Sequence, residues 1–463
     1  MSAHILFENL CCELGLDAFP ADRVTLTGAD PVYPMPFRIG EAAAAVLALQ
    51  GVMLDALRVQ QGMAPQQIAV DCRSASASTY AVAFQRQNGH NWQYNDPDYP
   101  TTDFYRTGDG RWIFLHGGYP KLRDGILDIL NVPNNRSRIA DAVMTWNAEY
   151  LESTLADAGL CGAVVRTFEE WQAHPQGRAV QSEPLIRLTK VSDSAPRSRR
   201  YGTEQTLQCL RVLDFTHVIA GPTATRGLAQ MGADVLHISS PHRPRILPFD
   251  VDTNHGKRNA YLDLSVLADQ QTAARLVGDA DVFVQSYRPE ALGRYGLSVS
   301  EMEALNPHLI AVNLNCYGHT GPWKNRPGFE QLAQTCTGMA MAQGENQKPQ
   351  LGPTYPNDYL TGYLATLGVL MALERQSREG GAWQVDVSLC RTATWLQQQG
   401  QVTGWQKADG PAAEWIAACM ATETGPFGEL HYFNTALRLE KTPLRFTTPA
   451  QPLGAHLPKW LSR

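Results

Sequence analysis

The sequence predicts an α/β protein with a parallel, Rossmann-like sheet flanked by helices and a smaller α+β domain. Three observations indicate this class. Short apolar runs alternate with helical stretches after residue 206, which is typical of a parallel sheet. A segment with another order of strands and helices precedes this region. The chain has 463 residues, 44% of them hydrophobic, so it can bury a large core in two or three domains.

We expect the large domain over 206–400 and a C-terminal extension over 401–463. Its predicted strands are buried apolar runs, at 212–215, 234–238, 281–286 and 309–318. A turn at Gly221–Pro222 separates the first strand from a helix that ends near Met231. A second helix is predicted after Asp358, because leucines recur at three- and four-residue spacing from Leu360 onwards.

The part of the chain before residue 206 has a different order. It contains predicted helices at 41–58, 121–130 and 137–158, strands at 66–74 and 111–118, and a closing segment at 162–171. We expect a small domain over 96–190. Residues 191–205 are polar, with a proline and a basic cluster, and therefore predict a linker.

Two pairs of segments with similar sequences suggest an internal duplication. Residues 40–70 align with 357–387, so that Gly51 meets Gly368 and Glu41 meets Asp358. The second pair is 183–196 and 442–458. Amphipathic helices converge easily, but two such pairs in the same order favour a partial duplication. We therefore interpret 1–95 as a partial repeat of the helix and strand of the large domain.

Charge and cysteine usage exclude several classes of partner. Thirty-nine basic and 45 acidic residues give a net charge of −6, which favours neither nucleic acid nor a membrane surface. The nine cysteines form no CxxC pair, and no HExxH motif is present, so we expect no metal. The first residues lack the pattern of a secretory signal, and no apolar run of about 18 residues occurs. We expect a reduced, cytoplasmic protein.

The motifs of common nucleotide and hydrolase sites are missing. The first strand of the large domain leads into "THVIAGPTATRG" rather than GxGxxG, and neither a Walker A loop nor a GxSxG elbow occurs. What remains is Asp358, at the start of a helix. It could simply cap the helix, or, because an aspartate is ionised at neutral pH, it could attack an activated acyl group once water is excluded.

Five blocks in this order resemble the family III CoA-transferases, the carnitine–CoA transferase and formyl-CoA transferase group: "LRVLDFTHVIAGPTATRGLAQMGADVLHI", "NHGKRNAYLDL", "ADVFVQSYRPEALGRYGL", "LNPHLIAVNLNCYGHTGPW" and "NDYLTGYLATLGVLMALERQ". The resemblance implies that Asp358 forms an aspartyl anhydride and then an aspartyl-CoA thioester, so that CoA passes between carboxylic acids. It also implies an interlocked homodimer. A CoA thioester would be the substrate, with no permanently bound cofactor. The segment that looks like the family's small domain precedes the large domain here, which indicates a permuted or duplicated arrangement.

The resemblance also implies the residues that contact CoA. They are Val218, Ala220, Leu262, Tyr287 and Arg294. In addition, the adjacent basic residues Lys257 and Arg258 form a local pattern that is typical of phosphate binding. Each could instead be a core or surface residue. Glu330 and His217 are possible supporting residues, whereas Glu41 is expected to be structural.

Two further positions bear on the reaction. Phe329 stands where the racemases of the family have a histidine, and phenylalanine cannot move a proton. Ile219 replaces a glutamine of formyl-CoA transferase, which makes formyl or oxalyl chemistry less favoured. Two alternatives to intermolecular transfer stay open: an acyl-CoA isomerase or intramolecular CoA mutase of the same fold, and a non-catalytic paralogue.

Overall fold

The computed structural model describes residues 2–16, 18–19, 21–92, 99–288 and 291–462. The predicted boundary between 1–95 and 96–190 lies outside the described residues. All the elements below belong to these described ranges.

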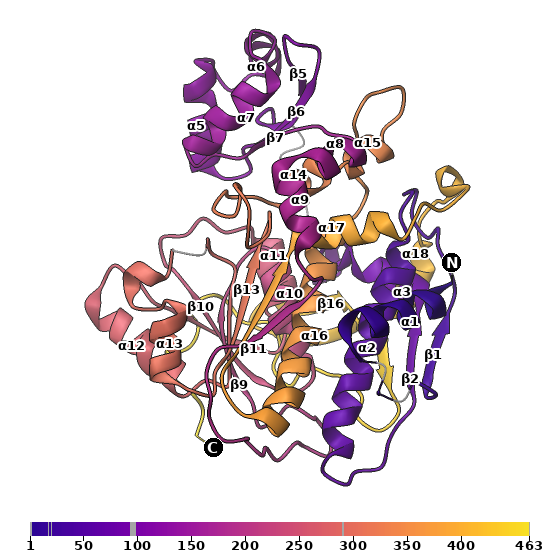
Figure 1. Cartoon of the computed structure of the whole chain (residues 1–463), viewed down its shortest axis with the longest axis vertical. Helices are drawn as coiled ribbons and strands as arrows, with labels where there is room; N and C mark the ends of the chain where they lie inside the picture. The colour runs from indigo at the N-terminus through magenta and orange to yellow at the C-terminus, as the bar shows by residue number, and fades with distance from the viewer. Residues whose placement is uncertain (1, 17, 20, 93–98, 289–290, 463) are drawn as a thin grey trace.

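A seven-stranded sheet forms the centre of the molecule (Figure 1). Its strands, in spatial order, are β11 (Lys257–Tyr261), β10 (Asp234–Ser239), β9 (Arg211–Phe215), β12 (Val282–Gln285), β13 (Ile310–Asn315), β14 (Trp383–Ser388) and β8 (Arg187–Lys190). All neighbours pair in parallel except β8, which runs antiparallel to β14. The predicted parallel sheet is thus confirmed, and β8 joins it from the N-terminal half of the sequence.

Helices cover both faces of this sheet because successive side chains of a strand point to opposite faces. On β9, Val212 packs into the core shared with α10 (Ala220–Gln230) and α16 (Pro356–Glu379). Leu213 packs on the other face, in the core shared with α12 (Leu267–Gly278) and α13 (Val299–Leu305). The turn predicted at Gly221–Pro222 is in fact the first turn of α10, where proline is tolerated since that N–H has no helical partner.

A second, three-stranded sheet, which we call the N-terminal sheet because two of its strands come from the first 71 residues, lies to the right in Figure 1. It has the order β1 (Val24–Thr27), β2 (Ile68–Asp71), β17 (Leu437–Leu439). The helices α1 (Ala3–Leu14), α2 (Ile39–Val59), α3 (Cys72–Ser78) and α4 (Ala81–Phe84) accompany it. The helix α2 packs against α16 of the large sheet. Among the described helices, only α2 is long and apolar enough to cross a membrane, and 89% of its apolar window is buried inside the protein. It is a core helix.

A separate unit stands above the rest of the molecule in Figure 1. It consists of the sheet β5 (Thr102–Arg106), β6 (Trp112–His116), β7 (Gly162–Val164) and the helices α5 (Pro120–Leu130), α6 (Arg136–Val143) and α7 (Ala148–Asp157). The single helix predicted at 137–158 is wrong. The side chains of Asn135 and Asn147 each accept first-turn N–H bonds, so they start two separate helices. We call this part the cover unit, residues 102–164.

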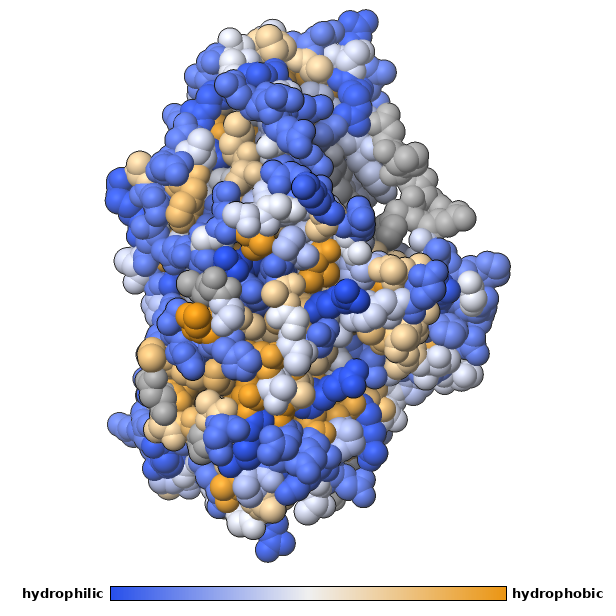
Figure 2. Space-filling model, turned by 90° about the vertical axis from the view of Figure 1, so that its right-hand side faces the viewer, coloured by the Kyte–Doolittle hydropathy of each residue, from blue (hydrophilic) through white to orange (hydrophobic). Residues whose placement is uncertain are grey.

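A four-stranded antiparallel sheet has the order β15 (Met420–Gly425), β16 (Gly428–Phe433), β3 (Arg86–Gln87), β4 (His90–Asn91). The other described elements are α8 (Phe168–Ala173), α9 (Pro175–Ser182), α11 (Leu247–Thr253), the 3₁₀ turn η1 (Gly293–Tyr295), α14 (Glu330–Cys336), α15 (Met339–Gln343), α17 (Leu389–Gln398), the 3₁₀ turn η2 (Trp405–Lys407) and α18 (Ala413–Cys419). Figure 2 shows the side of the molecule that carries the N-terminal sheet. Polar side chains dominate its upper part, and apolar side chains gather among polar ones in its lower part.

Candidate active site

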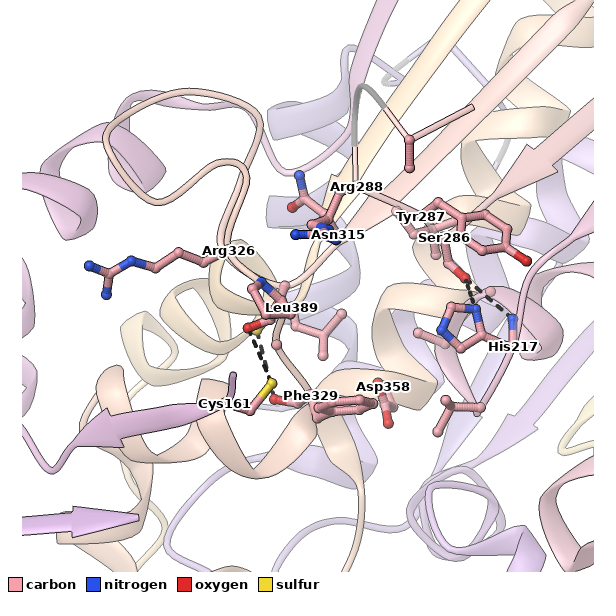
Figure 3. A pocket seen from close by; sticks show the side chains of 18 of the residues that line it. Cys161, His217, Ser286, Tyr287, Arg288, Asn315, Arg326, Phe329, Asp358 and Leu389 are labelled. Carbon is pink, nitrogen blue, oxygen red and sulfur yellow. Dashed lines mark hydrogen bonds between the residues drawn. The ribbon is translucent and has the colours of Figure 1, made fainter. Parts of the chain in front are cut away.

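A cleft of about 350 Å³ opens at the carboxyl ends of β9, β12 and β13. This edge is where parallel sheets usually bind ligands, since the loops that follow the strands converge there. Residues 217–221 follow β9, and residues 286–288 follow β12. Asp358 and Leu389 enter from the first turns of α16 and α17, and Cys161 enters from the cover unit (Figure 3). Leu122 of the cover unit also lines the cleft.

Asp358 lies at the floor of this cleft, in the first turn of α16. It is 7% exposed. Its own backbone N–H donates to Glu330 Oε2 at 2.6 Å. Within the described residues, its carboxyl group has neither a hydrogen-bond donor nor an ion-pair partner, so this carboxyl does not act as a helix cap. An unpaired carboxyl at the wall of a cleft is available to a ligand.

Glu330 lies beneath Asp358, at the start of α14, and is buried. Its Oε1 accepts from Gln334 Nε2 at 2.8 Å and from Asn357 Nδ2 at 2.9 Å. Burial raises the pKa of Glu330 to about 7 despite these donors. Burial, and then the charge of Glu330, raise the pKa of Asp358 well above its usual value. Both shifts favour the protonated form of this carboxyl pair more than in an isolated, solvent-exposed aspartate.

The loop after β9 carries backbone strain. Val218 has φ of +70°, a region that a β-branched residue adopts only at a cost. Helix α10 begins at Ala220 without a side-chain cap, and Ile219, Ala220 and Gly221 all line the cleft. The positive end of the α10 dipole thus meets the cleft beside Asp358.

His217 begins the same loop and is held in a neutral form. Its ring Nδ1 lies 3.2 Å from Ser286 Oγ, and its backbone N–H donates to the same oxygen at 3.3 Å (Figure 3). Burial, together with the charge of Arg243, holds the pKa of His217 well below its ordinary value. A neutral imidazole can position a ligand by hydrogen bonding but adds no charge to the cleft.

Cations dominate the rim. Of the described residues that line the cleft, five are basic and Asp358 alone is acidic: Arg243, Arg288, Arg294, Lys324 and Arg326. Arg243 also donates to Tyr287 Oη at 2.8 Å, which links the loops after β10 and β12. This distribution suits a ligand with several negative charges at one end and an electrophile at the other.

The structure brings together most of the residues predicted for the site. His217, Val218, Ala220, Tyr287, Arg294 and Asp358 all line the cleft, with Glu330 directly behind Asp358. Four cationic residues of the rim were missed, namely Arg243, Arg288, Lys324 and Arg326. The signal that could have found Arg288 is its place directly after Tyr287, in a loop that follows a strand.

Lys257 lies away from the cleft, contrary to its interpretation as a phosphate grip. Its ammonium is completely buried and donates to Asp214 Oδ2 at 2.9 Å, Thr225 Oγ1 at 2.7 Å and the Pro222 carbonyl at 3.0 Å. These bonds tie β9 and β11 to the first turns of α10. Lys257 therefore fixes the helix that borders the cleft without reaching the ligand.

Arg258 and Leu262 also lie elsewhere. Arg258 forms a bidentate pair with Asp234 at 2.8 and 3.0 Å and donates to the Lys459 carbonyl. Leu262 is 4% exposed and packs in the core beneath α12. Side chains alternate along a strand and its continuation, so neighbours in the sequence face different surroundings.

Phe329 forms part of the cleft wall beside Asp358 (Figure 3). Its ring stacks on His116 and Tyr119 with centroid distances of 4.4 and 5.8 Å. Both partners come from the cover unit or its edge, so this stack fixes the cover unit against the large sheet. Burial lowers the pKa of His116 to about 4, which keeps its ring neutral.

These features define a class of protein: an α/β enzyme whose cationic cleft at the strand ends leads to a buried carboxyl pair. Comparisons with known proteins specify it further. Residues 207–418 match the model of CoA-transferase family III. The acetyl-coenzyme A transferase nodX of Hypoxylon pulicicidum is 28% identical over 414 residues, covering 79% of this chain and 70% of that protein. The succinyl-CoA–L-malate CoA-transferase beta subunit of Chloroflexus aurantiacus is 32% identical over 204 residues, covering 41% of this chain and 50% of that protein.

Among solved structures, the crystal structure of Rv3272 from Mycobacterium tuberculosis is 31% identical, with a TM-score of 0.40, over 43% of this chain and 59% of that one. Residues 207–418 of the chain are thus similar to CoA-transferase family III, and the relatives from Hypoxylon pulicicidum and Chloroflexus aurantiacus are named as CoA-transferases.

Proposed function

We propose that this enzyme transfers coenzyme A between carboxylic acids through covalent intermediates on Asp358. The observation that carries the proposal is the unpaired carboxyl of Asp358, at the end of a cleft whose rim bears five basic residues. The phosphates of CoA fit the rim, and the thioester carbonyl fits the end that holds the nucleophile.

The chemistry balances without any other reactant. The Asp358 carboxylate attacks the thioester carbonyl of the donor, which forms a mixed anhydride and releases CoA thiolate. The thiolate attacks the aspartyl carbonyl, so the donor acid leaves and an aspartyl-CoA thioester remains. An acceptor carboxylate attacks this thioester and releases the thiolate again. The thiolate then takes the acceptor's acyl group from the new anhydride, which regenerates Asp358.

The surrounding residues have supporting roles in this proposal. Val218, Ala220 and Tyr287 border the path of the ligand, and Arg294 with the other rim cations holds the phosphates. The first turn of α10 offers N–H groups for the oxyanion of each tetrahedral intermediate. Glu330 is a positioning residue, because it holds the backbone N–H of Asp358 and not the ligand.

Water must be kept from the anhydride, and the cover unit supplies that protection. Leu122 and Cys161 bring its apolar and thiol surface to the cleft. Excluding water also strengthens the electrostatic interactions inside the site. Intermolecular transfer is favoured over proton exchange, because Phe329 separates the neutral ring of His116 from the cleft.

The compartment we propose is the cytoplasm. The thiols of Cys336 and Cys390 lie 3.7 Å apart without a bond between them, as is usual where thiols stay reduced. Because similar proteins are named for acetyl-CoA and succinyl-CoA chemistry, those two thioesters are the first donors to try.

The test is a transfer assay. Acetyl-CoA or succinyl-CoA is mixed with a panel of carboxylates, and new acyl-CoA is followed by chromatography. Transfer by the wild type, lost in Asp358→Asn while CoA still binds, would support the proposal. Transfer that persists in Asp358→Asn above about a thousandth of the wild-type rate would overturn it, since losing a covalent nucleophile costs more than that.

A further inference from the structure

Two of the described sheets, the seven-stranded sheet and the N-terminal sheet, contain the same three-strand pattern. In the large sheet, β13 is parallel to β14 and β14 is antiparallel to β8. In the N-terminal sheet, β1 is parallel to β2 and β2 is antiparallel to β17. The sequences agree as well: β1 begins Val-Thr-Leu-Thr beside Ile68, and β13 has Val-Asn-Leu-Asn from Val312, beside Val385.

The third strands keep the same register. Leu188 and Arg187 of β8 lie opposite Val385 and Asp386. Leu439 and Arg438 of β17 lie opposite Ile68 and Ala69. The counterpart of β8 is therefore 437–439, and the similar segment predicted at 442–458 is displaced along the chain. "LIRLTK" at 185–190 then aligns with "ALRLEK" at 436–441.

Two glycines show that the helix packing is repeated too. A methyl group at Gly51 of α2 would collide with Ile68 and Leu437, and one at Gly368 of α16 would collide with their counterparts, Val385 and Ile186. Each helix thus crosses its own sheet at a glycine. The two helices lie side by side (Figure 1). Near their ends, the repeat-related Gln60 and Ser377 contact each other at 3.3 Å, as expected for residues beside a two-fold axis.

The third strands are exchanged between the two halves of the sequence. The strand β8 follows α3 and the cover unit, but pairs with β14 of the second copy. The strand β17 follows α17, but pairs with β2 of the first copy. Each half therefore completes the sheet of the other, and the cover unit of the first half lies on the cleft of the second.

The first copy also has a carboxyl pair. Glu41, in the first turn of α2, is the counterpart of Asp358, and its backbone N–H donates to Asp30 Oδ2 at 2.8 Å. The Asp358 N–H donates to Glu330 in the same way. Burial raises the pKa of Asp30 to about 7, as it does that of Glu330. The hydrogen-bonding arrangement of the active carboxyl pair is thus present twice.

The two pairs differ in what they can do. Arg38 Nη1 lies 2.8 Å from Glu41 Oε2, and Glu41 is 2% exposed. This ion pair occupies the carboxylate that would correspond to the nucleophile. In the part of the chain that the structure describes, the N-terminal sheet has three strands, and none of them corresponds to β9 or β12, whose loops contribute to the cationic rim of the cleft.

We infer that this single chain contains both members of an interlocked pair, with one working carboxyl at Asp358 and a silenced counterpart at Glu41. The inference goes beyond the proposed function, because it assigns the catalytic unit and the origin of its two halves. The interlocked partner implied by the resemblance is then supplied by the chain itself, and one chain holds a complete site.

The first experiment needs no turnover. Mass photometry of the full-length protein at nanomolar concentration should give one species of about 51 kDa, the mass of one chain. A species of about twice this mass that does not dissociate on dilution would overturn the inference. This result stands whether or not the proposed transfer reaction is found.

The second experiment asks whether two chains share a site. Two full-length variants are co-expressed with different tags: Asp358→Asn, and Leu122→Trp, which fills the cleft from the cover unit. If each site is built from one chain, the purified mixture has no more activity than the sum of the separate variants. Recovery of a quarter or more of wild-type transfer would mean that cover unit and cleft come from different chains. Glu41→Gln serves as the matched control, with transfer expected within about twofold of wild type.

Discussion

At the residue scale, the central feature is the pair of buried, neighbouring carboxyl groups of Glu330 and Asp358. Glu330 receives N–H bonds from Gln334, Asn357 and Asp358, and these favour its ionised form. Asp358 has no such donors to its carboxyl within the described residues. Its negative charge can be stabilised only by a bound ligand or by the positive end of the α10 dipole. This difference explains why Asp358 is the group left to react.

Replacing Glu330 by Gln should shift the pH profile of transfer. In the wild type, burial and then the charge of Glu330 raise the pKa of Asp358, so the reactive carboxylate is lost as pH falls through that raised value. Without the neighbouring charge, the pKa of Asp358 falls, and the acidic limb of kcat/KM should move to lower pH by about one unit. The measurement is the pH dependence of transfer from acetyl-CoA for both proteins. An acidic limb that stays in place would show that Glu330 does not control Asp358.

Replacing Lys257 by Met should destabilise the fold and leave Asp214 buried without its partner. We expect a loss of about 3–5 kcal/mol at neutral pH in urea unfolding. Burial alone would raise the pKa of Asp214, but the charge of Lys257 and bonded hydroxyls hold it at about 2. The wild type therefore keeps this stabilisation above about pH 4 and loses it as pH falls towards 2, so the two proteins should converge in acid.

The control for this change is Lys257→Met with Asp214→Asn. Removing both charges should restore much of the lost stability, because no uncompensated charge remains. Equal instability of the single and double variants would indicate lost packing instead.

At the element scale, the site depends on how closely α16 approaches α10. A Cβ on Gly362 would lie 2.6 Å from the Ala220 carbonyl oxygen, so only glycine allows this contact. That contact brings the first turn of α10 and the first turn of α16 to the same end of the cleft. Two helix starts therefore meet at the reacting carboxyl.

Replacing Gly362 by Val should push the two helices apart. We expect transfer to fall by at least about tenfold, because a displacement of about 1 Å of a reacting group is costly. Thermal unfolding and the transfer rate should be measured together. The matched control is Gly278→Ala in α12, whose added Cβ would approach only the Leu305 carbonyl oxygen, at 3.9 Å. Full activity in Gly362→Val would contradict the proposed role of this contact.

The sequence predicted the parallel strands of the large sheet and the helix of Asp358, since both depend on local apolar patterns. It could not predict β8 and β17 in exchanged positions, because strand pairing over hundreds of residues leaves no local signal. Among the site residues, Val218 and Tyr287 were predicted correctly as lining the cleft, because the family resemblance implied those positions in the loops after two strands. Lys257 was misjudged because a buried ion pair and a phosphate grip look alike in sequence.

At the scale of the whole molecule, charge is distributed unevenly. The chain carries a net charge of −6, yet the cleft rim concentrates five basic residues. The attraction for a polyanionic ligand is therefore local, and salt should weaken it. The affinity for CoA, measured by calorimetry, should fall by about tenfold or more between 50 and 500 mM NaCl.

The matched comparison uses a ligand without the nucleotide. Affinity for pantetheine, which lacks phosphates, should change little over the same salt range. CoA binding that is insensitive to salt would exclude the rim as the phosphate site.

In the proposed reaction, Asp358 becomes covalently acylated and then carries CoA. The most direct measurement is intact-protein mass spectrometry after rapid mixing with acetyl-CoA and acid quenching, followed by peptide mapping. We predict one adduct per chain, an acetyl or a CoA thioester group on the peptide that contains Asp358, absent from Asp358→Asn and removed by hydroxylamine. Turnover without any adduct on that peptide, or an adduct on another residue, would contradict the account.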